Sequence, residues 1–363
     1  MFTVKPNRPE AILLVFVALI LLFVVTGFLA KAYRSERRSR AETHFRKGET
    51  LARNGQPLAA VEEYRAALTY SGNDRQYELA LSLALESLGR LDEAEAHLVE
   101  LREADPNNAL VSLLLARIAV REGRTVDAVA DYNRAIYGLW PRDPQKNRIQ
   151  TRFELVDLLG RTGQTRQVLG ELLSLAAEAP EDPTIQNRIA EMLLRYGSPQ
   201  HAAEVFRSVL EYEPRNGEAS FGLAQALFHE GNYAAAESQY RRALRLKPSN
   251  IEAQKRIDDI AEMMALDPTV LTLRASQRYE RSRELIRRTA ASLQACLGTR
   301  AAPPGAQALL QNAGNFVEAH RRHREGDTPE ALALASGLWK ARHDLCGQPP
   351  QDGLSLVMAK VTR

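Results

Sequence analysis

The sequence lacks the residue combinations on which most catalytic sites depend. It contains no glycine-rich phosphate loop ending in Lys-Ser or Lys-Thr, no Cys-x-x-Cys pair, no His-Glu-x-x-His motif and no nucleophile elbow. His320 and His323 lie three residues apart, but they belong to the run His-Arg-Arg-His-Arg, where neighbouring cations oppose a divalent metal. We expect a solvated helix face there, and we expect no metal, no cofactor and no enzyme activity. A catalytic site hidden in the C-terminal third is the alternative.

Aromatic residues and net charge are also scarce. Aromatic residues make up 6% of the chain while apolar residues make up 45%, mostly leucine, alanine and valine, which is typical of all-α proteins. The 48 basic and 45 acidic residues leave a net charge of +3, so the whole chain exerts no strong attraction on nucleic acid. We therefore predict an all-α protein with no nucleic-acid partner.

One uncharged apolar run, Ala-Ile-Leu-Leu-Val-Phe to Thr-Gly-Phe-Leu-Ala, covers residues 11–30. As a helix that rises about 1.5 Å per residue, it is long enough to cross the roughly 30 Å hydrocarbon layer of a bilayer. Residues 31–47 then carry seven bases and two acids. This pattern predicts a tail (1–10), a transmembrane helix (11–30) and a basic juxtamembrane linker (31–40), with residues 31–47 contacting anionic head groups.

A cleaved secretory signal is the alternative to a membrane anchor. Ala30-Lys31-Ala32 resembles a small-x-small cleavage site, and Lys5 and Arg8 provide a basic start. Cleavable signals normally have an apolar core of only about 7 to 15 residues, so the length of this run favours an anchor.

A period of 34 residues organises the middle of the chain. Glycines with separations of 34, 34, 40, 34 and 34 lie at Gly55, Gly89, Gly123, Gly163, Gly197 and Gly231. Five residues later comes a small or short residue, at Ala60, Ala94, Ala128, Val168, Ala202 and Ala236. Glycine ends a first helix, the small residue lets a second helix pack closely, and a proline such as Pro248 ends the second helix.

This pattern resembles the tetratricopeptide repeat, best in Leu223-Ala224-x2-Leu227, Ala236-x3-Tyr240 and Pro248. The resemblance covers about residues 41–250 and implies a right-handed solenoid of six helix-turn-helix repeats that binds other proteins. No repeat has the family's opening tryptophan. The related pentatricopeptide proteins, which read RNA, resemble the pattern at 35 rather than 34 residues per repeat. We expect the solenoid and a capping helix in 41–266, with Asp258 and Asp259 on the outer face of that helix.

Two irregular segments interrupt or follow the array. The six extra residues between repeats three and four lie around 139–146, where Trp140 is either a docking element or a side chain that packs over the joint. From residue 267 to 363 the period is lost, and we expect a small helical bundle with helices at 270–296, 306–324 and 328–346.

The resemblance also implies a concave groove lined by the first helix of each repeat. Counting the periodic glycine as position 15, repeat positions 5 and 9 hold Phe45, Glu49, Leu79, Leu83, Leu113, Arg117, Phe153, Asp157, Asn187, Glu191, Phe221 and Gln225. These residues are the predicted partner groove, although some of them could instead pack only between adjacent repeats. No repeat carries the Lys and Asn at positions 5 and 9 that are typical of domains gripping chaperone tails. Position 13 forms a basic column of Arg53, Arg121, Arg161 and Arg195, which could hold acidic partner groups or simply meet the negative end of each helix dipole.

These observations favour a single-pass scaffold of a bacterial-type inner membrane, and self-assembly into a homo-oligomer is the alternative. The seven bases after the span narrowly favour a cytoplasmic solenoid under the positive-inside rule. Cys296 and Cys346 are the only cysteines, and each ends a predicted helix at the same pole of the bundle. A disulfide between them would indicate the periplasm instead.

Overall fold

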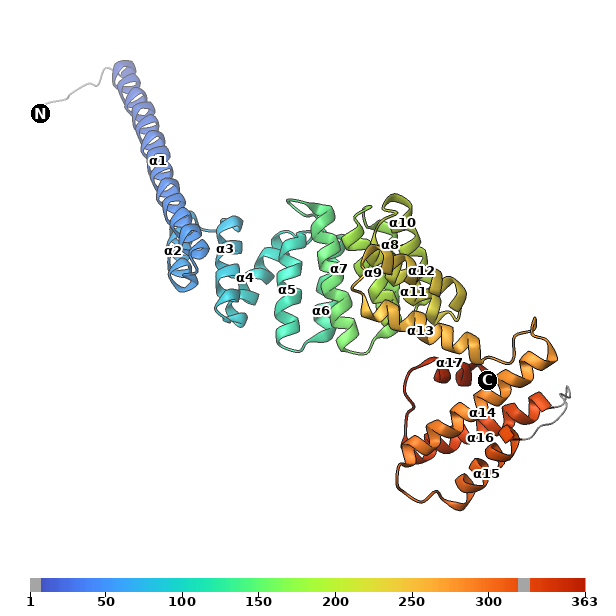
Figure 1. Cartoon of the computed structure of the whole chain (residues 1–363). Helices are drawn as coiled ribbons and strands as arrows, with labels where there is room; N and C mark the ends of the chain where they lie inside the picture. The colour runs from blue at the N-terminus through green and yellow to red at the C-terminus, as the bar shows by residue number, and fades with distance from the viewer. Residues whose placement is uncertain (1–7, 319–326, 363) are drawn as a thin grey trace, which may run out of the picture. The chain divides into compact units, whose positions relative to one another are not determined.

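The protein is described by a computed structural model in which residues 8–318 and 327–362 are placed, and these residues form 17 α-helices and no strand (Figure 1). In chain order the helices are α1 (Arg8–Arg53), α2 (Pro57–Ser71), α3 (Arg75–Ser87), α4 (Leu91–Ala104), α5 (Ala109–Arg121), α6 (Thr125–Tyr137), α7 (Pro144–Arg161), α8 (Thr165–Glu178), α9 (Pro183–Arg195), α10 (Pro199–Tyr212), α11 (Gly217–His229), α12 (Tyr233–Leu246), α13 (Ile251–Leu266), α14 (Ala275–Leu297), α15 (Pro304–Glu318), α16 (Asp327–Cys346) and α17 (Gly353–Val361).

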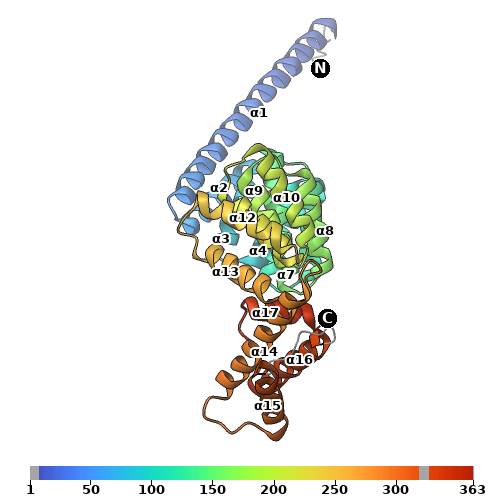
Figure 2. The same ribbon diagram turned by 45° about the vertical axis from the view of Figure 1, so that its right-hand side comes forward.

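The chain divides into two compact units, residues 1–171 (unit 1) and residues 172–363 (unit 2). Unit 1 holds α1 to α7, and unit 2 holds α9 to α17, while α8 crosses the boundary. Helices α1 to α12 form six antiparallel pairs, as the 34-residue period predicts, so the all-α repeat fold is confirmed. Helices α14 to α17 follow as the C-terminal helices (Figure 2).

The turn inside each pair is set by the periodic glycine. All six glycines adopt a positive φ, between 73° at Gly55 and 80° at Gly231, a conformation that costs side-chain-bearing residues energy. The first helices begin at side chains that accept hydrogen bonds from the exposed N–H groups, as Asp74 does for Tyr77 and Asn216 does for Ala219. These local signals explain why the repeat boundaries are readable in the sequence.

The small residue of each repeat packs where the two helices approach most closely. Ala60, Ala94 and Ala128 in unit 1, and Ala202 and Ala236 in unit 2, are all fully buried. Because alanine has no side chain beyond Cβ, the helix axes can lie at the short end of the usual range.

Helix α1 joins the apolar run to the first repeat without a break. It contains 46 residues, and at about 1.5 Å per residue the segment from the apolar run to Arg53 is a single long rod (Figure 1). The predicted linker at 31–40 is therefore helical. The described part of α1 is long and apolar enough to cross a membrane, with an 18-residue window of mean hydropathy 2.5 in which no residue is buried.

The segment between α6 and α7 is held against the preceding repeat. The Leu139 N–H donates to the Asn107 carbonyl at 2.7 Å, and the Ala109 N–H donates to the Leu139 carbonyl at 3.2 Å. Trp140 is half-buried and its Nε1 is inaccessible to solvent, so this side chain packs over the joint between repeats.

The C-terminal helices differ from the sequence prediction in two ways. Helix α14 begins at Ala275 rather than at residue 270, because the Asp267 carboxylate accepts hydrogen bonds from Thr269 and from Lys360 and so holds a turn there. Helix α17 was not predicted, since it is only nine residues long. It packs on α13, with Gly353 directly against the Asp259 carbonyl and the Glu262 side chain.

That contact changes the outer face of α13. Asp259 was expected to face solvent, and this prediction was wrong, because the residue is only 7% exposed. The first and third helices of the expected bundle are joined at one end by a disulfide between Cys296 of α14 and Cys346 of α16, whose Cα atoms lie 6.2 Å apart. The predicted helix 306–324 is described as far as Glu318, and its remaining residues lie outside the described ranges.

Candidate functional site

Several predicted groove residues of unit 1 pack between repeats instead of lining an open surface. Phe45, Leu113 and Phe153 are 6%, 6% and 3% exposed. The Phe45 ring stacks on Tyr77 of the next repeat, with ring centroids 4.5 Å apart. Position 5 in these repeats therefore joins neighbouring helix pairs, and only a partner that displaced a repeat could reach these side chains.

The accessible part of this face in unit 1 comes mainly from position 9. At position 9, Leu83 is 41% exposed, Asp157 is exposed, and Glu49 is half-buried beside Arg53. At position 5, Leu79 is half-buried and packs against the core. Arg117 donates two hydrogen bonds to the Glu154 carboxylate, at 3.0 and 2.8 Å. This bidentate ion pair holds both side chains in a fixed geometry across α5 and α7.

Unit 2 brings four predicted site residues together around one pocket of about 460 Å³ on α9 and α11. They are Glu191, Arg195, Phe221 and Gln225. Leu194, Glu218, Gly222 and His229 complete the lining. His229 occupies position 13, the position of the basic column, and Leu194 is the neighbour of Arg195 on α9, whereas Glu218 and Gly222 lie outside the positions that the repeat pattern singles out. Asn187, also predicted for the groove, is 4% exposed, and its amide donates to Asn216 at 3.4 Å.

Gly222 lines this pocket and is packed closely against Phe206 of α10. A Cβ atom at this position would lie 2.1 Å from Cζ of Phe206, far inside van der Waals contact. The absence of a side chain leaves room for the tip of the Phe206 ring against α11. The neighbouring Phe221 ring is half-buried at the pocket and lies edge-on to Tyr240, with ring centroids 5.6 Å apart.

The four arginines of the basic column all lie in the last turn of their helices. In unit 1, Arg121 pairs with Glu86 of the preceding repeat at 3.1 Å, and Arg53 lies 3.5 Å from Glu49. Arg161 is exposed. In unit 2, Arg195 shares its pocket with Glu191 and Glu218. Internal carboxylates thus offset much of the column's charge, which favours the helix-dipole interpretation over a continuous anion site.

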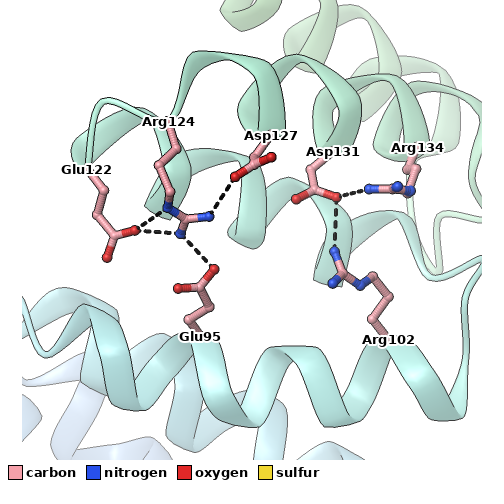
Figure 3. Close-up of polar contacts among 7 residues, drawn as sticks. All are labelled: Glu95, Arg102, Glu122, Arg124, Asp127, Asp131 and Arg134. Atoms are coloured by element: carbon pink, nitrogen blue, oxygen red, sulfur yellow. Dashed lines mark hydrogen bonds and ion pairs between the residues drawn. The ribbon is translucent and has the colours of Figure 1, made fainter.

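The second helices carry charges that pair with one another. Arg124 contacts Glu95, Glu122 and Asp127, and Asp131 accepts from Arg102 and Arg134 (Figure 3). These networks join the α4 region to the α6 region. The outer face in this part of unit 1 is therefore satisfied internally, and the first-helix face is the better candidate for partner binding.

A second pocket in unit 2, of about 450 Å³, was not predicted. Phe228 and Arg256 form one wall, with the guanidinium 5.1 Å from the ring centroid, and Trp339 and Pro349 belong to the C-terminal helices and the loop before α17. Its lining residues lie up to 131 positions apart, from Phe228 to Ala359, so no local pattern could reveal them.

Asp259 lines this second pocket and is expected to cost stability at neutral pH. Burial raises the pKa of its carboxyl, opposed by Arg256 at 3.7 Å, and its Oδ2 has no hydrogen-bond partner among the described residues. A raised folded-state pKa means that the stability of the fold decreases as pH rises above the ordinary aspartate pKa of about 3.9.

We expect Asp259→Asn to stabilise the protein by about 1 kcal/mol at pH 7, and we expect this gain to vanish below about pH 4. Thermal unfolding at both pH values tests this, with the exposed neighbour variant Asp258→Asn as the control. A destabilised Asp259→Asn protein at pH 7 contradicts the prediction.

Within the described ranges, no group of three or more His, Cys, Asp or Glu side chains is arranged to hold a metal ion. His320 and His323 lie outside the described residues.

The geometry defines a class of protein: an array of antiparallel helix pairs that offers the surfaces of its first helices, which is the architecture of a helical-repeat protein. A tetratricopeptide repeat family model matches residues 79–144 and 193–251, and a second tetratricopeptide repeat model matches residues 41–74. Residues 41–74, 79–144 and 193–251 are therefore tetratricopeptide repeats.

Solved structures with similar folds include other tetratricopeptide repeat proteins. YrrB, described as a TPR protein with an unusual peptide-binding site, is 17% identical with a TM-score of 0.40, covering 53% of this chain and 97% of its own. The pilF protein of Pseudomonas aeruginosa is 15% identical with a TM-score of 0.39, and the match covers 60% of this chain and 97% of the pilF chain. The C-terminal part of a TPR repeat-containing protein from Cytophaga hutchinsonii is 14% identical with a TM-score of 0.44, and the match covers 84% of this chain and 96% of that structure's chain. No curated protein sequence matches this chain.

Proposed function

We propose that this protein is a membrane-tethered scaffold that binds segments of partner proteins on the first-helix faces of its repeats. Tetratricopeptide repeats are protein-interaction modules in general. The pocket on α9 and α11 carries the specific proposal, because it combines the half-buried Phe221 ring with Arg195, Glu191 and the Gln225 amide. An extended or helical segment with one apolar anchor and polar neighbours of either charge fits such a site.

Photocrosslinking from this pocket tests the proposal. A photoreactive residue at Gln225, in the full-length protein in its native membrane, is expected to capture a partner protein, whereas the same group at the exposed Ser238 on α12 is not. Arg195→Glu, at an exposed position, is expected to reduce capture about tenfold, which corresponds to about 1.4 kcal/mol, without changing thermal unfolding.

Two outcomes would contradict partner binding at this pocket. Equal adducts from positions 225 and 238 would mean that capture is non-specific. Adducts that contain only two copies of this chain would support the alternative, in which the repeats mainly mediate self-assembly.

The tether in this proposal is α1, with residues 11–30 in the bilayer. Near its exit, Arg40, Arg46 and Lys47 already lie in ion pairs with Glu36, Glu42 and Glu63. Lys31, Arg34 and Arg38 are therefore the better candidates for contact with anionic head groups.

The disulfide between Cys296 and Cys346 supports the periplasmic alternative for the folded domains, because such bonds persist in oxidising compartments. The seven bases after the span favour the cytoplasm, but long domains cross membranes largely regardless of flanking charge. We therefore propose a periplasmic solenoid, and thiol labelling tests its side of the membrane.

A further inference from the structure

The segment around the joint between repeats three and four, residues 137–146 (the joint segment), exposes large apolar side chains at fixed positions. Tyr137 is 74% exposed and Leu139 is 73% exposed. The backbone of Leu139 is held by its two hydrogen bonds to the α4–α5 turn, so the side chain is not free to fold back into the core. Two large apolar side chains held outward within three residues present apolar surface at this point of the molecule.

The joint segment lies on the edge of unit 1 from which the apolar part of α1 extends. In unit 1 the first helices run in the direction of α1, toward the glycine turn, so the loops between these repeats lie at the opposite end (Figure 1). The Arg37 side chain of α1 donates a hydrogen bond to the carbonyl of Thr69, near the end of α2, at 3.0 Å. Arg37 follows Ala30, the last residue of the apolar run, by seven residues, which is about 10 Å along the helix. The end of α2 therefore lies close to the end of the apolar run. The α6–α7 loop belongs to this same edge.

The chemistry of the joint segment suits the interfacial layer of a bilayer. Tyrosine concentrates at the head-group level, where one end of its ring is apolar and the other is wet, and Tyr137 is 74% exposed. Trp140 in the same segment is half-buried with its Nε1 shielded from solvent, so it reports on the surroundings of the segment rather than forming the contact itself. The joint segment also carries two exposed basic residues, Arg142 and Lys146, and one exposed acidic residue, Asp143. Basic side chains at this depth are attracted to anionic lipids.

We propose that the joint segment rests in the lipid head-group region as a second membrane contact of unit 1. The inference relies on the proposed anchoring by α1. Because α1 continues into the first repeat without a break, a tilt of the helix lowers this edge toward the bilayer, and transmembrane helices commonly tilt by about 20° and by up to about 40°. The two contacts together would fix the orientation of the first three repeats at the membrane surface.

Tryptophan fluorescence tests the contact directly, since the chain has only two tryptophans. In the full-length Trp339→Phe protein, Trp140 is the sole tryptophan. The protein is reconstituted into vesicles of phosphatidylcholine and phosphatidylglycerol, with and without bromine atoms near the head-group end of the acyl chains. We expect lower emission in the brominated vesicles, and we expect Leu139→Glu in the same background to abolish this quenching.

Val126→Glu is the matched control, because Val126 is 83% exposed at the start of α6, on the opposite edge of unit 1. Quenching that survives Val126→Glu but not Leu139→Glu supports the contact. A protein that floats with the vesicles but shows no quenching, or equal quenching in both variants, overturns the joint-segment proposal and leaves the anchor intact. A protein that does not float overturns the anchor and the inference with it.

Discussion

Replacing Ala236 with aspartate is expected to unfold the repeats of unit 2. Ala236 is fully buried where α12 packs against α11. An aspartate carboxylate at this position would add volume to a closely packed interface, and it would lose its hydration without gaining an ion-pair or hydrogen-bond partner in return. Together these effects are expected to cost at least about 3 kcal/mol, a large share of the stability of an ordinary domain. Circular dichroism during thermal unfolding measures the loss, and Ala94→Asp is expected to do the same in unit 1.

The chain provides a matched control for each change. Ala234 and Ala96 lie two residues from Ala236 and Ala94, on the same helices, and both are exposed. Aspartate at either exposed position is expected to leave the melting temperature nearly unchanged, because surface substitutions usually cost within about 0.5 kcal/mol. If the buried and exposed variants melt alike, the assigned packing of the helix pairs is incorrect.

Cys346→Ser is expected to destabilise the C-terminal helices by roughly 4 kcal/mol. The bond between Cys296 and Cys346 closes a loop with a sequence separation of 50 residues, and the chain-entropy model assigns a loop of that size about this value. Thermal unfolding of the oxidised protein, of the reduced protein and of the variant measures the effect. The reduced protein and the variant are expected to melt at the same temperature, and an oxidised protein that melts with them contradicts a stabilising bond.

The same cysteines report the side of the membrane. Labelling with a membrane-impermeant maleimide on intact cells is expected to require prior reduction, because a disulfide in the periplasm is accessible but unreactive. Free thiols that react only after lysis, without reductant, would support a cytoplasmic solenoid.

The repeats could be predicted because their signals are local. Gly231 ends a first helix through its own backbone conformation, and Ala236 is small enough for close packing whatever its neighbours are. The other five glycines share this conformation, and four of the other repeats have the alanine while the remaining one has Val168, so six weak signals in register became a strong one. Helix α17 escaped prediction because nine residues carry too little periodicity, and Asp259 was assigned to the wrong surface because that short helix covers it.

The groove was predicted as a set of positions, and the fold gave those positions different roles. Glu191, Arg195, Phe221 and Gln225 meet around one pocket. Phe45, with the same repeat position as Phe221, is buried instead, because Tyr77 of the next repeat stacks on it. Repeat position predicts which way a side chain points along its own helix, but not what the neighbouring repeat places in front of it.

Spacing within one or two helices was enough to predict the all-α class, the six helix pairs, their turns and an apolar helix long enough to cross a membrane. The continuity of α1 into the first repeat, the Arg117–Glu154 ion pair and the pocket shared by Phe228 and Trp339 could be found only in the folded chain. These features depend on how separate helices rotate and approach one another. That geometry comes from the packing of the whole unit, because the side chains that meet are not neighbours in any local pattern.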